Sequence, residues 1–145
     1  TQAVRSTPVV FADGSMTAVL GERWSAKARP TSSTLEAEGV AAYRADDAAW
    51  QDGLALVPAT VVPHLTDDFR WGRLYAGVAA APADLAIGVA SGSAVVLSPA
   101  GASVSGASVV VADGSGASSW VSANGAFGAS GVVLDVFGSG DQLAR

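Results

Sequence analysis

Turn signals recur at intervals of about ten residues through the second half of the chain, and they constrain its fold more than any other feature. From Leu54 to the C-terminus, short apolar runs alternate with Gly, Asp-Gly or Asn-Gly. Asp-Gly and Asn-Gly supply the positive φ angles that two-residue hairpin loops need. The sequence therefore predicts a mainly β fold, a small β-barrel or sandwich, over residues 54–145.

The composition indicates one domain that covers part of its surface with a partner. The chain has 145 residues, enough for one hydrophobic core. Half of them are apolar and 14% are charged, against a typical quarter, and large exposed apolar patches usually mark interaction sites. The absence of cysteine excludes disulfides and thiolate chemistry. A net charge of −5 with scattered basic residues disfavours nucleic acid, and no run reaches the ~20 apolar residues of a membrane span.

The first thirty residues predict an extended arm or hairpin. Pro8 favours an extended entry, and Val9–Phe11 is strand-like. Asp13-Gly14 is a turn signal, after which Met16–Leu20 would run back as the second strand. We therefore divide the chain into an arm at residues 1–30 and a single β-rich domain at residues 31–145.

One or two short helices are expected as an insertion near residues 34–52. Residues 31–34 are all Ser or Thr, which are favoured N-caps, and Ser33 with Glu36 forms a partial capping box. Tyr43 and Trp50 would supply the buried side of this insertion.

The stretch after residue 68 shows an alternating pattern. Phe69 and Trp71 are apolar, and Arg70 and Arg73 stand between the apolar positions that lead to Leu74. This alternation predicts a strand with one face in solvent.

The sequence VVFADGS at residues 9–15 recurs as VVVADGS at residues 109–115, with Phe11 replaced by Val111. Neither copy carries a reactive side chain, and the flanking residues are unlike. We interpret both copies as scaffold in which an apolar strand ends at an Asp-Gly turn, with internal duplication as the alternative.

No pattern of residues points to catalysis or metal binding. His64 is the only histidine, and it could act as a base with Asp67 or Asp68 or form part of a metal site. A single histidine without cysteine cannot complete a zinc set, however, and adjacent aspartates point in different directions. Ser91 and the other serines among the glycines lack the G-x-S-x-G pattern. We predict no catalytic, cofactor-binding or metal-binding residues.

The four tryptophans remain as candidates for binding. We interpret Trp50 and Trp120 as core or interface residues. Trp24 lies in a stretch without periodicity and is the preferred candidate for docking onto another chain, because Trp and Arg are frequent interface anchors. Trp71, which two arginines flank, is expected in an exposed recognition patch.

Residues 84–145 follow a recurrent order of strands. A G-V-A strand and an A/V-rich strand precede a G-A-x-V-V-x-A-D-G step, a GVVLD strand and a final GDQLAR strand. This order resembles the small β-barrel head-decoration, or capsid-cement, proteins of tailed bacteriophages, in which a similar pattern closes the barrel. Residues 23–63 depart from the simplest members of that family.

The resemblance implies a structural virion protein, not an enzyme and without a cofactor, that stabilises the assembled capsid by binding across neighbouring major capsid subunits. It implies a homotrimer on the outer capsid surface, synthesised in the host cytoplasm, and a start at Thr1 fits removal of an initiator Met. The arm would lie across a neighbouring subunit. The expected partner-binding residues are Arg5, Trp24, Arg29 and Trp71.

Two other classes of protein stay open. A β-rich cell-surface or fibre module would bind a protein, or a glycan through Trp71 and Trp120. A small hydrolase would use His64 with an aspartate.

Overall fold

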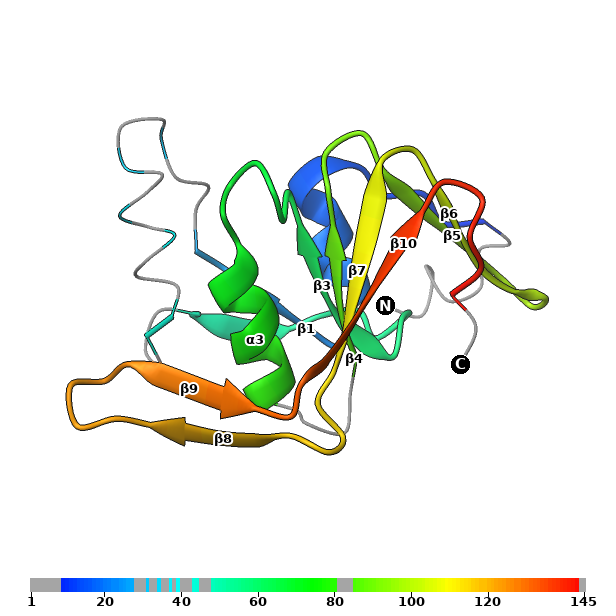
Figure 1. Cartoon of the computed structure of the whole chain (residues 1–145). Helices are drawn as coiled ribbons and strands as arrows, with labels where there is room; N and C mark the ends of the chain where they lie inside the picture. Colours follow the sequence, from blue (N-terminus) through cyan, green and yellow to red (C-terminus); the bar gives the residue numbers. More distant parts are fainter. Residues whose placement is uncertain are drawn as a thin grey trace.

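The centre of the molecule is a four-stranded mixed sheet (Figure 1). The structure, a computed structural model, describes residues 9–27, 31, 34, 37, 39, 43, 44, 48–80 and 85–143. The order of the strands across the sheet is β10-β7-β4-β3. These strands are β3 (Ala59–Pro63), β4 (Leu85–Val89), β7 (Ser108–Asp113) and β10 (Val133–Gly138).

Three two-stranded antiparallel sheets accompany the central one. They are β1 (Arg23–Ser25) with β2 (Trp50–Asp52), β5 (Ala94–Ser98) with β6 (Gly101–Ser105), and β8 (Ser118–Val121) with β9 (Phe127–Ser130). The mainly β fold with short helices is confirmed. Of the two expected architectures, the described strands form a sandwich-like arrangement of several sheets and no closed barrel.

A helix joins the two parallel strands of the central sheet. Since β3 and β4 run in the same direction, they need a crossover connection, which is α3 (Trp71–Ala80). Leu74 and Val78 lie on one side of α3 at helical spacing and are buried against the sheet. Gly77 allows close contact, because a Cβ there would lie 3.0 Å from the Thr60 side chain.

The predicted strand after residue 68 is therefore wrong. Its apolar positions also fit a helix, and α3 packs its apolar side on the sheet. Arg70 and Arg73 are buried, whereas the strand would have exposed them.

The hairpin predicted between residues 9 and 20 is also wrong. Gly14–Leu20 is a 3-10 helix, η1, and Asp13 caps it by accepting a hydrogen bond from the Gly14 N–H at 2.7 Å. η1 and β1 pack against β3, and the Glu22 N–H donates to the Ala59 carbonyl at 3.1 Å. Residues 14–25 thus cover the β3 edge of the sheet and form no arm. Residues 1–8 and 28–30 of the predicted arm lie outside the described residues.

Nine of the nineteen residues of the predicted helical insertion lie outside the described residues, and Ala37 and Gly39, which are described, are helical. The division at residue 30 stays a prediction. Near its end, Trp50 belongs to strand β2, which pairs with β1, and Tyr43 is exposed. Neither side chain supplies a buried helical stripe. Gly53 follows β2 and crosses Gly21 so closely that any side chain there would overlap the Gly21 carbonyl.

The core lies on both faces of the central sheet, because successive strand residues point to opposite faces. On one face, the β5–β6 hairpin and η1 cover a cluster that contains Val61, Ile87 and Val109. On the other face, α3 covers a cluster that contains Leu65 and Val110. The two layers enclose β4 and β7, which are the central strands.

Leu74 is fully buried between α3 and the sheet. Because Leu74→Ala removes apolar contacts and leaves a cavity, we expect it to lower the free energy of unfolding by about 2–5 kcal/mol. Denaturant unfolding followed by tryptophan fluorescence measures this loss. The control is Val96→Ala on the exposed side of β5, which should change stability by less than about 0.5 kcal/mol. Equal losses in the two variants would contradict this packing.

Candidate functional site

The structure does not gather the four expected partner-binding residues into one described site. Arg5 and Arg29 lie outside the described residues. Trp24 is half-buried in β1, where it pairs with Gln51 of β2. Trp71 is half-buried at the start of α3 and packs against the apolar cluster under the helix. Both tryptophans thus contribute to the packing of the body.

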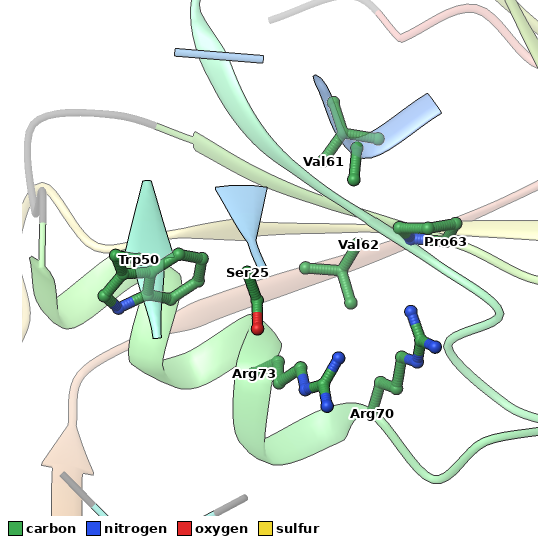
Figure 2. Close-up of a pocket in the computed structure, with 8 residues that line it drawn as sticks. Ser25, Trp50, Val61, Val62, Pro63, Arg70 and Arg73 are labelled. Carbon is green, nitrogen blue, oxygen red and sulfur yellow. The ribbon is translucent and has the colours of Figure 1, made fainter. Parts of the chain in front are cut away.

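Arg70 and Arg73 line a small pocket beside β3, together with Ser25 and Trp50 of the β1–β2 sheet (Figure 2). A nitrogen of Arg70 lies 3.0 Å from the Asp68 carboxylate, and both side chains are buried. The pocket encloses about 20 Å³, room for about one water molecule, whereas sites for small organic ligands span about 300–1,000 Å³. The prediction of an exposed patch around Trp71 is wrong, because the side chains of Arg70 and Arg73 are buried in this pocket.

His64, Asp67 and Ser91 meet at the carboxyl ends of the parallel strands β3 and β4. His64 Nδ1 lies 3.2 Å from Ser91 Oγ. The Ser91 N–H donates to the Asp67 carboxylate at 3.3 Å. Hydrogen bonding from the Ser91 side chain is the main cause that lowers the pKa of Asp67, with smaller contributions from the Ser91 N–H and from His64. The sequence analysis considered His64 with Asp67 and did not connect Ser91 to them.

The Ser91 N–H donates to Asp67, and the tautomer of His64 decides which way the hydrogen bond between His64 and Ser91 runs. A serine nucleophile needs a histidine that accepts the hydroxyl proton. Ser91 and Asp67 are exposed to solvent. The arrangement links the residues that follow β3 and β4 by hydrogen bonds.

Ser91→Ala removes the hydroxyl and should raise the pKa of Asp67 toward its ordinary value. Carboxyl carbon chemical shifts followed through an NMR pH titration measure this change. A lowered folded-state pKa stabilises the fold above the unfolded-state value of about 3.9, and the contribution is lost as the pH falls through the folded-state value. The control is Ser119→Ala on exposed β8, which should leave the titration of Asp67 unchanged. An unchanged pKa in Ser91→Ala would contradict the hydrogen bond.

Large apolar side chains are exposed on the segment before η1, on two of the outer hairpins and on β10. They are Val9, Val10, Phe11, Val96, Leu97, Trp120, Val121, Val133, Leu134 and Val136. Residues 85–143 contain three charged residues, Asp113, Asp135 and Asp141. Covering this surface therefore requires little desolvation of charge. Exposed apolar side chains that are neighbours, as Val96 and Leu97 or Trp120 and Val121 are in the sequence, are candidates for contact with another protein.

Trp120 is the largest side chain of this surface. It lies on β8 opposite Gly128 of β9, where any side chain would overlap the indole, and it is 54% exposed. Contacts to a distant segment anchor the β8–β9 hairpin: Arg44 Nη1 donates to the Asn124 carbonyl at 3.1 Å, and the Phe127 N–H donates to the Tyr43 carbonyl at 2.7 Å. The hairpin thus presents a supported aromatic surface to solvent.

Comparison with known proteins adds no relative. A scan of protein-family models finds no match, and a search of curated proteins finds none. In the described part of the chain, no helix is long and apolar enough to cross a membrane. The described residues contain no group of three or more His, Cys, Asp or Glu side chains arranged to hold a metal ion.

Proposed function

We propose that this chain is a structural protein, not an enzyme, and that it decorates and stabilises the assembled capsid of a tailed bacteriophage. The observation that carries the proposal is that the β5–β6 and β8–β9 hairpins each expose large apolar side chains and contain no charged residue. The resemblance of residues 84–145 to head-decoration proteins supports the choice of partner, the major capsid protein. On this proposal the chain binds on the outer face of the virion as a homotrimer.

Contact area supplies the binding free energy in this proposal. Burial of apolar surface contributes roughly 25 cal/mol per Å², and Trp120 and Val121 offer such surface on one strand. Stable protein interfaces cover ~800 Å² on each partner. Because many copies bind one shell, modest individual affinities combine into firm retention and hold neighbouring subunits together.

The packing of η1 changes which part of the N-terminus can act as an arm. Residues 14–25 are needed to cover the edge of β3, so deletion of residues 1–30 would damage the body. The free arm of the proposal ends at Asp13, and Arg5 remains its expected capsid-binding residue.

The test is co-sedimentation with purified phage heads assembled without this protein. Trp120→Ala should raise the dissociation constant by about tenfold or more, because exposed aromatic residues are frequent interface anchors. The matched control is Ser119→Ala, a neighbouring exposed residue of β8, which should bind as the wild-type chain does. A wild-type chain that stays in the supernatant at saturating concentration contradicts the proposal.

The exposed indole of Trp120 also favours one alternative, a β-rich surface module that binds glycans. Sugar rings stack on exposed aromatic faces, and Trp120 has one. Trp71, the second residue of that hypothesis, is half-buried at the start of α3 and packs against the apolar cluster between the helix and the sheet. Binding to a glycan array that Trp120→Ala abolishes, without binding to heads, would favour this alternative.

A further inference from the structure

The two edges of the central sheet differ. Residues 14–25 cover β3 at one edge, with the hydrogen bond from Glu22 to Ala59. At the other edge, β10 pairs with β7 along all six of its residues, and no described strand pairs with its outer side (Figure 1). Val133, Leu134 and Val136 of β10 are exposed, and Val136 is 69% exposed. An open apolar edge of this kind is a template for a strand from another chain.

The chain also contains a strand sequence that has no strand partner in the described fold. Residues 9–13 read VVFAD and differ only at Phe11 from VVVAD at residues 109–113. Residues 109–113 form most of β7. β7 is the strand to which β10 already pairs. Residues 9–13 form no strand, and Phe11 is 87% exposed. Asp13 has φ −128° and ψ 155°, so the end of the segment already has extended backbone.

We propose that residues 9–13 of one copy pair antiparallel with the outer edge of β10 in a second copy of this chain. The register is that of β7, in which Val110 lies opposite Val136. Val10 then lies opposite Val136, and Ala12 lies opposite Leu134. Antiparallel strands on the two sides of β10 follow the same alternation of side chains, so this register keeps the faces of the sheet matched.

The position of η1 favours a second copy over the same chain. Residues 9–13 lead directly into η1, which packs against β3 at the opposite end of the sheet from β10. Three strand spacings of about 4.8 Å separate β3 from β10. The β10 edge of its own chain is therefore poorly placed for the segment, and that of a second copy has no such restriction.

The pairing would give every copy a donor segment and an acceptor edge. Such head-to-tail contacts close into a ring when the rotation between copies permits it. The inference deepens the proposed homotrimer and rests on that part of the proposed function, although it does not depend on what the assembled protein binds.

Sedimentation velocity of the purified full chain, without capsids, tests the pairing. We expect the wild-type chain to self-associate. Val10→Asp in the donor and Val136→Lys in the acceptor should each raise the dissociation constant by about tenfold or more, since each places a charge in an apolar strand contact. Gln51→Lys is the control: it adds the same charge at an exposed site on β2, outside the set of exposed apolar residues, and should associate as the wild-type chain does.

The chain that carries both V10D and V136K tests the register. If the two positions are opposite, the introduced charges attract across the strands, and this chain associates more tightly than either single variant. Circular dichroism checks that each variant is folded. A monomeric wild-type chain, or a V10D chain that associates normally, overturns the pairing, and a double variant no tighter than the singles overturns the register. Binding to heads is measured separately, so either proposal can fail alone.

Discussion

The packing of α3 on β3 and β4 is the interaction on which the rest of the structure depends. Leu65 and Leu74 are fully buried there, and Leu65 occupies space that Gly88 leaves open, since a Cβ at Gly88 would lie 2.5 Å from the Leu65 side chain. This crossover lets β3 and β4 run parallel, and β7 pairs antiparallel with the other side of β4. Once one face is closed in this way, η1 and the β5–β6 hairpin close the other.

Several large apolar side chains of the outer strands lie outside the hydrophobic core and are exposed to solvent. The β8–β9 hairpin reaches the body through residues 43 and 44, and all four residues of β8 are exposed. β10 packs Phe137 against the core and leaves Val136 in solvent. The exposed apolar residues of β10 thus lie where the central sheet ends. Trp120 lies on the separate β8–β9 hairpin, which hydrogen bonds to Tyr43 and Arg44 anchor.

Local turn chemistry predicted part of the fold from the sequence. Asn124-Gly125 lies in the turn between β8 and β9, where Gly125 has a φ of 80°. The Ser122 N–H donates to the Ala126 carbonyl, so the loop has three residues and not the two that the sequence predicts. The same chemistry failed at Asp13-Gly14, because the aspartate side chain can also cap a helix, and contact with β3 favours η1. Tertiary packing, which the local pattern does not encode, separates the two outcomes.

Burial was harder to predict than secondary structure. The sequence analysis placed Arg70 and Arg73 on the solvent side of a strand, because arginine is seldom buried without a partner. Arg70 has such a partner in Asp68, and a pattern of apolar positions does not reveal that contact. The run from Val132 to Phe137 has the composition of a central strand, although β10 lies at an edge. Trp120 was expected in the core or an interface, and it is exposed on a hairpin that is anchored by a hydrogen bond between Arg44 and Asn124, eighty positions apart.

The scarcity of charge in residues 85–143 has a consequence for the conditions under which any complex forms. Dissolved ions weaken attraction between charged groups, and they have little effect on contacts between neutral apolar groups. An association through the β8–β9 hairpin therefore tolerates a wide range of ionic strength. A protein held in this way keeps its partner when the surrounding medium is diluted or concentrated.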